Sequence, residues 1–293
     1  MRSEAGSTLE PLLVLMSGRS GSTLLMQLLA TSDEIGFRRE PPFEVRHLSY
    51  LLRWAQSIGA EGAMTADSDR PREFFDAPTL GNRSEPSTFR WPGAVAEGLW
   101  RPAFESAWRA FSERAVRGPD YAPCGAARFH AEKASLWSAE SLSELEVPHR
   151  RLYLLRDPRD VLLSIWSFNQ KRGSLDFGVR EGETMVEHAE RFFVEMRDRL
   201  RLLLELQTTS DTSCIVRFDE MVEDLPEVAH QLGEFLGVRL DAGRVLADSS
   251  RFAGHRTSSS RTGSRWRSEL SQELQARCEQ ILGSELEALG LGG

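Results

Sequence analysis

Two sets of side chains in this chain have the types and the spacing that suit the binding of an anion. The first set is a short loop with hydroxyl donors and one permanently charged guanidinium: Arg19, Ser20, Gly21, Ser22, Thr23 and Leu24. The second set is Arg156, followed eight residues later by Ser164. A phosphate or sulfate group needs such donors and a compensating positive charge, so both sets predict a site for one of these anions.

The loop follows an apolar run, Pro11–Met16, and precedes residues with the apolar spacing of a helix. This pattern predicts a buried strand, a tight turn and a helix start. Backbone N–H groups at a helix start point to one spot, where the helix dipole favours an anion. Gly18 and Gly21 permit the unusual backbone angles and the close approach that such a loop needs.

The loop differs from the phosphate-binding loop of nucleoside triphosphatases, in which a lysine follows the second glycine. If Gly21 is that second glycine, Met16 takes the place of the first glycine and Ser22 takes the place of the lysine. The positive charge comes instead from Arg19, which stands earlier in the loop. Taken alone, the loop is also compatible with an ordinary turn between a strand and a helix.

The second set lies at another transition from a strand to a helix. Residues 151–155 are apolar enough for a buried strand, and either Asp157 or Asp160 suits the N-terminus of the following helix. Arg156 is therefore expected at the carboxyl end of a strand. Because ligands of parallel α/β sheets bind beyond the carboxyl ends of the strands, we expect Arg19 and Arg156 to face one crevice.

Together, the two sets resemble the sulfotransferases that use 3′-phosphoadenosine 5′-phosphosulfate (PAPS). The [K/R]-S-G-[S/T]-T core of that family corresponds to Arg19–Thr23, which implies that this loop holds the 5′-phosphosulfate. The strand-end arginine and the later serine of the family correspond to Arg156 and Ser164, which implies contacts with the 3′-phosphate. Two further pieces match in order, a strand with an acidic turn and a helix at 216–237, and a Ser- and Arg-rich loop at 258–266.

The resemblance implies an α/β, three-layer P-loop-like fold with a central parallel sheet flanked by helices. It implies a single sulfotransferase domain over residues 1–293, in which about 57–127 form an insertion that covers the acceptor site. The expected reaction moves a sulfuryl group from PAPS to a hydroxyl or an amine of a small-molecule, glycan or lipid acceptor, without a metal. The alternatives are a P-loop kinase of small molecules and a non-catalytic module that binds PAPS or 3′-phosphoadenosine 5′-phosphate (PAP).

Glu40 is the expected general base, because bacterial and carbohydrate sulfotransferases resemble this chain in having a Glu-Pro pair after the second strand. Neighbouring arginines, if they are close, would lower the pKa of Glu40 and weaken it as a base. Glu44, taken to be one helical turn away, can exchange roles with Glu40, and His47 and His130 are further alternatives. A surface ion pair with a neighbouring arginine is the non-catalytic interpretation of Glu40.

The resemblance also implies roles for cations and for the C-terminal loop. Lys133 and Arg19 are expected to neutralise charge in the transition state, although a surface lysine without a role is an alternative for Lys133. Arg261 and Gly263 are expected to contact the 3′-phosphate, within a basic segment of an otherwise acidic chain. Phe218 stands where many relatives have a tyrosine, so a packing role is expected for it.

Composition sets limits on partners and location. The net charge of -8 and the pI near 5.4 argue against nucleic acid or an anionic membrane as the main partner. No run is apolar for long enough to span a membrane, and Cys124, Cys214 and Cys278 are scattered without metal-ligand spacing. We therefore expect a cytoplasmic enzyme, and the dominance of arginine over lysine favours a GC-rich bacterial source. The sequence leaves the acceptor and the oligomeric state open.

Local signals predict several further elements. A short strand is expected at 35–38, and residues 104–111 have aromatic side chains at helical spacing. Thr184 and Glu187 form a capping box that opens a long helix, and another helix is expected between Asp224 and Gly237. The last helix is expected to begin at Ser268, with these residues facing inward: Leu270, Leu274, Cys278 and Ile281.

Overall fold

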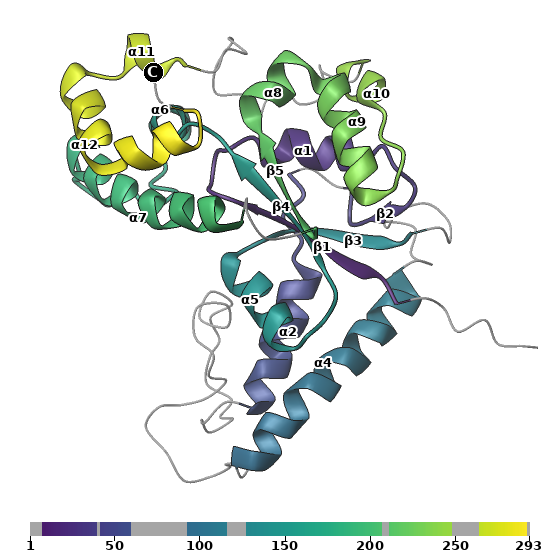
Figure 1. Ribbon diagram of the computed structural model, residues 1–293. Helices are drawn as coiled ribbons and strands as arrows, with labels where there is room; N and C mark the ends of the chain where they lie inside the picture. Colours follow the sequence, from purple (N-terminus) through teal and green to yellow (C-terminus); the bar gives the residue numbers. More distant parts are fainter. Residues whose placement is uncertain are drawn as a thin grey trace, which may run out of the picture. The chain divides into compact units, whose positions relative to one another are not determined.

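The computed structural model describes residues 8–39, 42–59, 93–115, 127–206, 211–247 and 264–291 (Figure 1). The chain divides into two compact units. The first unit comprises Met1–Leu13 and Asp33–Arg150, and the second comprises Val14–Ser32 and Arg151–Gly293. The loop Arg19–Leu24 and the pair Arg156 and Ser164 both belong to the second unit.

The strands of the described residues form one sheet in the order β2-β3-β1-β4-β5. Their bounds are β1 Glu10–Met16, β2 Ile35–Gly36, β3 Phe129–Ala134, β4 Arg150–Leu155 and β5 Ser213–Arg217. The pairs β2–β3 and β4–β5 are parallel. The predicted α/β class with a central parallel sheet flanked by helices is confirmed.

In the first unit, β2 pairs with β3 so that Ile35 lies opposite Phe129 and Gly36 lies opposite His130. The helices of this unit are α2 His47–Gly59, α4 Gly93–Ala115 and α5 Leu136–Glu144. Helices α2 and α4 pack along each other (Figure 1). The expected helical spacing of aromatic residues is confirmed on α4, where Trp108 is buried and its Nε1 donates to the carbonyl of Leu9 at 2.9 Å.

In the second unit, β4 pairs with β5 from Arg151 opposite Ser213 to Leu155 opposite Arg217. One group of helices gathers beside α1 Ser22–Leu29: α8 Phe218–Glu223, α9 Leu225–Leu236 and α10 Ala242–Ala247 (Figure 1). The other group contains α6 Pro158–Arg172, α7 Met185–Leu206, α11 Trp266–Glu269 and α12 Gln272–Ala288. Within it, α7 packs along α12 (Figure 1).

Two of the predicted helix starts are confirmed by their hydrogen bonds. The Glu187 carboxylate accepts from the backbone N–H of Thr184 at 2.8 Å, and the backbone N–H of Glu187 donates to the Thr184 hydroxyl at 3.3 Å. The Asp224 carboxylate accepts from the backbone N–H of Glu227, and α9 ends at Gly237, whose φ of 65° is left-handed. Side chains near each terminus thus satisfy backbone groups that a helix end leaves unpaired.

The prediction for the last helix was wrong in its start and in one inward residue. Ser268 lies in the short α11, and α12 begins at Gln272, where the Ser271 hydroxyl accepts from the backbone N–H of Leu274. Cys278 is buried as expected, but Leu282, four residues on, is buried in place of Ile281. The spacing of four keeps the side chains on one face of a helix with 3.6 residues per turn.

The expected insertion and the expected lack of a membrane-spanning segment can be compared only with the described residues. Of the expected insertion at about 57–127, residues 57–59, 93–115 and 127 fall within them, so its role as a cover of the acceptor site stays a prediction. Within the same residues, none of the helices combines the length and the apolar character that crossing a membrane requires.

Candidate active site

The loop between β1 and α1 has the backbone geometry that its glycines predict. Gly21 caps α1 in a left-handed conformation with φ 98°, and Arg19 adopts φ 65° although it is not a glycine. The buried Ser20 hydroxyl donates to the carbonyl of Ser17 at 2.5 Å, which closes the turn. Such consecutive turns aim backbone N–H groups at the start of α1 toward one position, where an anion is favoured.

Two aromatic rings press against the glycines of this loop. A Cβ at Gly18 would lie 2.3 Å from the ring of Phe177, and a Cβ at Gly21 would lie 2.3 Å from the ring of Phe218. Both positions therefore exclude any larger residue unless a ring moves. The expected packing role of Phe218 is confirmed, since its ring also lies 4.3 Å from the Arg156 guanidinium.

The structure brings together the two predicted anion-binding sets. Arg156 Nη1 donates to the carbonyl of Arg19 at 2.9 Å, and Arg19 Nε donates to the Ser164 hydroxyl at 3.4 Å. The Arg19 guanidinium also lies over the ring of Phe168 at 4.5 Å. The second strand–helix transition and the loop after β1 therefore build one cluster of donors.

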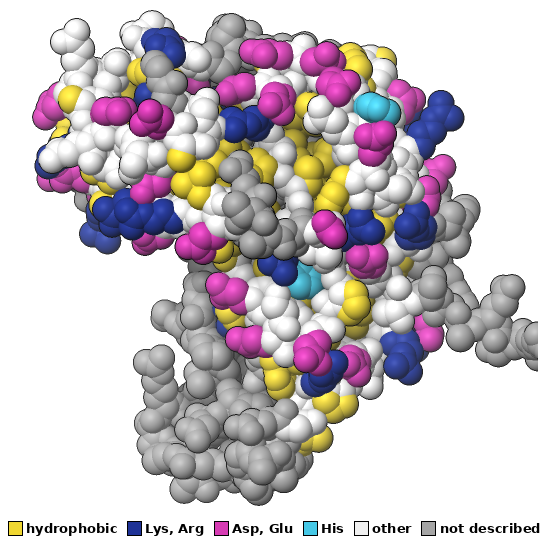
Figure 2. Space-filling model, in the orientation of Figure 1, with side chains coloured by type: hydrophobic (Ala, Val, Ile, Leu, Met, Phe, Trp, Pro, Cys, Tyr) yellow, Lys and Arg dark blue, Asp and Glu magenta, His cyan; other side chains and the backbone are white. Residues whose placement is uncertain are grey.

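Positive charge is concentrated in this cluster. Burial, together with the charges of Arg156 and Arg172, lowers the pKa of Arg19 to about 10. Burial also lowers the pKa of Arg156, against the opposing effect of Asp160 and Asp219. On the face shown in Figure 2, basic and acidic side chains are interspersed.

The cluster fits a ligand with several negative charges. Within the described residues, Arg156 Nε is buried and has no hydrogen-bond partner. A buried donor of this kind is costly unless an acceptor reaches it, and an anionic oxygen is the strongest acceptor for a guanidinium. PAPS carries a phosphate at the 3′ position of its ribose and a phosphosulfate at the 5′ position, so its charges match the donors of Arg19, Arg156 and Ser164.

The aromatic and basic residues that surround the loop were not among the predicted site residues. Phe168 and Arg172 follow Ser164 at intervals of four, so the helical spacing of α6 was an available signal for both. Phe177 lies after α6, with a positive φ of 58° and 41% of its surface exposed. Nothing local in the sequence indicates that its ring packs against Gly18.

Lys133 occupies a different environment in the first unit. Its side chain is only 2% exposed, and its Nζ donates to Glu44 Oε1 and to the carbonyl of Pro42, each at 2.6 Å. The surface alternative for Lys133 was therefore wrong. The placement of Glu44 one helical turn after Glu40 was also wrong, because residues 42–46 are not helical and α2 begins only at His47.

The two alternative histidine bases lie near a buried carboxylate in the same unit. Glu132 accepts from the backbone N–H groups of Leu48 at 2.7 Å and Ser49 at 3.0 Å, and thereby caps the start of α2. The buried His130 places Nε2 3.4 Å from Glu132 Oε2. Burial lowers the pKa of His47, which favours a neutral imidazole there.

Three predicted site residues, Glu40, Arg261 and Gly263, lie outside the described residues. Of the expected loop contacts, Ser22 is buried at the start of α1, while Thr23 and Leu24 are half-buried beside it. Among the described residues, no three His, Cys, Asp or Glu side chains gather in a way that could hold a metal ion.

The fold and the donor cluster define an α/β protein with arginine and hydroxyl donors gathered after the carboxyl ends of β1 and β4, where parallel α/β sheets bind ligands. The family model of the sulfotransferase family matches residues 11–242, and the chain therefore belongs to that family. A comparison with curated proteins found no significant match.

Two solved structures are similar along nearly their whole length. The sulfotransferase domain from the Synechococcus PCC 7002 olefin synthase is 19% identical, with 95% of each chain covered and a TM-score of 0.51. The sulfotransferase domain from the curacin biosynthetic pathway is 17% identical, with 95% of this chain and 98% of that chain covered and a TM-score of 0.53. At these identities the similarity concerns the fold.

Proposed function

We propose that this sulfotransferase moves a sulfuryl group from PAPS to a hydroxyl or an amine of a small-molecule, glycan or lipid acceptor. The observation that carries the proposal is the convergence of Arg19, Arg156 and Ser164 on the loop that starts α1. Membership of the sulfotransferase family supports the reaction type. The proposal includes a cytoplasmic location, which the scattered cysteines favour.

The nucleotide-binding roles follow from position. The loop Arg19–Leu24 would hold the 5′-phosphosulfate through backbone N–H groups and hydroxyls at a helix start. Arg156 and Ser164 would hold the 3′-phosphate, the guanidinium through charge-assisted hydrogen bonds. Arg261 and Gly263 are assigned to the same phosphate from the resemblance of the C-terminal loop.

The catalytic roles divide between charge stabilisation and proton removal. During transfer, the acceptor oxygen or nitrogen forms a bond to sulfur as the bond from sulfur to the bridging phosphate oxygen breaks, and PAP leaves. Arg19 would stabilise the charge that develops on this leaving group, because its guanidinium is fixed beside the loop before the reaction starts. Lys133 would contribute a second positive charge, and Glu40 would accept the proton of the acceptor.

A specific feature of the loop favours this reaction over phosphoryl transfer by a P-loop kinase. Such a kinase needs a lysine directly after the second glycine, and Ser22 stands there. The cation of this loop is Arg19, which is always charged at neutral pH and binds oxyanions in a fixed fork.

The direct test is transfer of a radiolabelled sulfuryl group from PAPS to a panel of phenols, alcohols, amines, glycans and lipids. We expect PAP release to match the labelled product, and turnover to persist with a chelator. Arg156→Ala should abolish transfer, whereas Arg277→Ala, which removes an exposed ion pair with Glu190, should not. Turnover of ATP with Mg²⁺ in place of PAPS would contradict the proposal, and PAP binding without any transfer would favour a non-catalytic module.

A further inference from the structure

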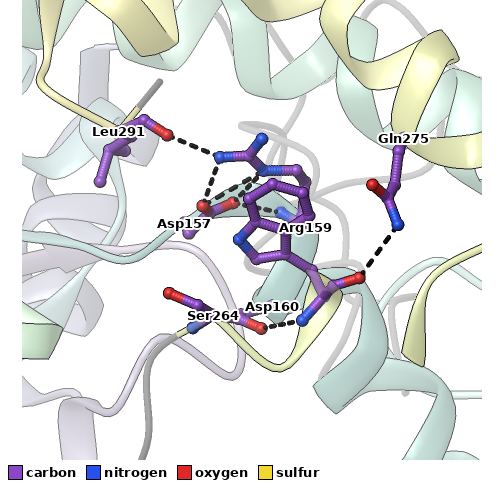
Figure 3. A network of polar contacts seen from close by, with 7 residues as sticks. Asp157, Arg159, Asp160, Ser264, Gln275 and Leu291 are labelled. Atoms are coloured by element: carbon purple, nitrogen blue, oxygen red, sulfur yellow. Dashed lines mark hydrogen bonds and ion pairs between the residues drawn. The ribbon is translucent and has the colours of Figure 1, made fainter. Parts of the chain in front are cut away.

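Asp160 makes an unusual pair of contacts for an acidic residue in the first turn of a helix. It is buried, and its two carboxylate oxygens accept from the backbone N–H groups of Ser264 at 2.6 Å and Trp266 at 3.0 Å (Figure 3). The start of its own helix, α6, is already capped by Asp157, which accepts from the backbone N–H of Arg159 at 2.8 Å. The Asp160 carboxylate therefore serves a segment about a hundred residues away in the chain.

The backbone of that segment is shaped to receive an anion. Ser264 is left-handed with φ 84°, and Arg265 follows in the right-handed helical region with φ -56° and ψ -31°. This alternation turns the N–H groups of Ser264 and Trp266 toward one point and creates a concave anion site. The Asp160 carboxylate occupies it, so the strained conformation of Ser264 is compensated by two charge-assisted hydrogen bonds.

A second set of contacts holds the same segment on the same turn of α6. The guanidinium of Arg159 lies 3.5 Å from the centre of the Trp266 ring, which is itself buried. Arg159 is fixed in turn by an ion pair with Asp157 at 2.7 Å and by donation to the carbonyl of Leu291 at 2.6 Å (Figure 3). The first turn of α6 thus joins two stretches of the C-terminal part of the chain.

This turn lies between the two residues assigned to the 3′-phosphate. Asp160 follows Arg156 by four residues and precedes Ser164 by four, which is about one helical turn from Ser164. Its negative charge favours the charged form of Arg156, whose pKa is otherwise lowered by burial and by Arg265. Asp160 therefore acts on Arg156 electrostatically and on the surroundings of the site through Ser264 and Trp266.

We propose that Asp160 is a positioning residue of the 3′-phosphate site, which it holds in a binding geometry by clamping Ser264 and Trp266 onto the first turn of α6. The proposal rests on the proposed function, since it concerns the same nucleotide site. No direct contact with the nucleotide is assigned to Asp160, because both of its oxygens accept from backbone donors.

Two roles of Asp160 predict changes of opposite sign when its charge is removed. If Asp160 were merely a negative charge near the site, its neutralisation would reduce repulsion and strengthen the binding of a phosphate. If it positions the site, neutralisation to asparagine replaces one of the two acceptor oxygens by an NH2 donor that faces a backbone N–H, which loosens the clamp and weakens binding. A variant of equal size therefore separates the roles.

The experiment is calorimetric titration of wild type, Asp160→Asn and Asp160→Glu with PAP and with adenosine 5′-phosphate, which lacks the 3′-phosphate. In Asp160→Asn we expect PAP affinity to fall about tenfold, the size expected for losing a charged hydrogen bond, and adenosine 5′-phosphate affinity to change less than twofold. Asp160→Glu keeps the charge and should recover part of the PAP affinity. Asp224→Asn is the matched control, because it removes a carboxylate that caps α9, and it should alter neither affinity.

Unchanged or tighter PAP binding in Asp160→Asn would overturn the proposal. An equal loss for both nucleotides would also overturn it, since a general structural defect does not distinguish the 3′-phosphate. Cooperative thermal unfolding of each variant confirms that it is folded. Failure of the wild type to bind PAP would be a failure of the proposed function, and it is visible before any variant is compared.

Discussion

The two cationic regions of this protein treat their charges in different ways. In the first unit, buried Lys133 lies 2.6 Å from the carboxylate of Glu44, so the chain itself supplies a neutralising charge. In the second unit, Arg19 lies among Arg156 and Arg172, which together with burial lower its pKa to about 10. The comparison teaches that the fold gives Lys133 an internal counter-charge and places Arg19, Arg156 and Arg172 close together, where a polyanionic ligand would stabilise them.

Replacement of Arg156 is expected to have the largest effect, and the quantity it changes is PAP affinity. Arg156→Ala removes the buried guanidinium assigned to the 3′-phosphate, and we expect PAP affinity to fall on the order of 100-fold. Adenosine 5′-phosphate should bind nearly as well as to wild type. Calorimetric titration measures both, with Arg277→Ala as an exposed control. A PAP affinity within threefold of wild type would remove Arg156 from the site.

Substitution of two glycines in the second unit is expected to have the next largest effect, which is on folding stability. Gly21→Ala and Gly173→Ala both place a side chain at positive φ, but only at Gly21 would the new Cβ meet a ring, that of Phe218 at 2.3 Å. Gly173 lies at the end of α6 with nothing within 4 Å of the added atom. We expect about 1 kcal/mol of lost stability for Gly173→Ala and about 2 kcal/mol or more for Gly21→Ala.

Denaturant unfolding of the two glycine variants tests that difference. The double variant Gly21→Ala, Phe218→Leu should regain part of the stability lost in Gly21→Ala, because the obstructing ring is gone. Equal losses for the two single variants would show that the close packing of Phe218 on the loop has no energetic consequence.

Removal of Lys133 should change turnover but leave nucleotide binding intact. If Lys133 has the proposed role, kcat should fall about tenfold in Lys133→Ala, since a positive charge that stabilises the transition state is lost. PAP affinity should stay within twofold of wild type. Glu44→Gln is the companion variant, because it keeps the lysine and removes its internal partner. A large loss of PAP affinity in Lys133→Ala would mean that the charge of Lys133 belongs to nucleotide binding.

The smallest expected effects are those of pH, and they differ between the two regions. An anion favours the protonated form of Arg19, so PAP affinity should be constant near neutral pH and fall as pH rises through about 10. His47 has a pKa below its ordinary value of 6.5, so the unfolded chain binds its proton more readily than the folded chain. Folding stability should therefore decrease as pH falls through 6.5.

A binding measurement and an unfolding measurement, each made at several pH values, test these two expected pH dependences. PAP affinity of the wild type should decline across the alkaline range. In Arg19→Ala the affinity should be lower overall, and this decline should be absent. Denaturant unfolding of wild type and His47→Gln at neutral and mildly acidic pH should show a smaller loss of stability in the variant. An increase in wild-type PAP affinity above pH 10 would contradict the assignment of Arg19.

The fold, the loop after β1 and the pair Arg156 and Ser164 could be predicted because the sequence signals for them are local. An apolar run, a glycine-rich turn and helical spacing all lie within residues 11–25, and β1, its loop and α1 form as expected. The pair Arg156 and Ser164 is fixed by one strand–helix transition. The meeting of these two sets follows from the general rule that ligands bind at the carboxyl ends of parallel strands.

The remaining contacts could not be predicted because their partners are distant in sequence. Lys133 meets Glu44 across 89 residues, and Asp160 meets Ser264 across 104. Neither pair has a periodicity or a spacing that marks it. The helical interpretation of the segment before α2 failed for a related reason, because Pro42 and Glu44 contact Lys133, which is distant in the sequence.

Titration of the wild-type protein with PAP, with adenosine 5′-phosphate and with ATP plus Mg²⁺ tests the central claim most directly. The arginine cluster of the second unit predicts that PAP binds tightest, that a chelator leaves its affinity unchanged, and that loss of the 3′-phosphate weakens binding on the order of 100-fold. Preference for ATP with Mg²⁺, or equal binding of PAP and adenosine 5′-phosphate, would contradict the claim that this cluster is a PAPS site.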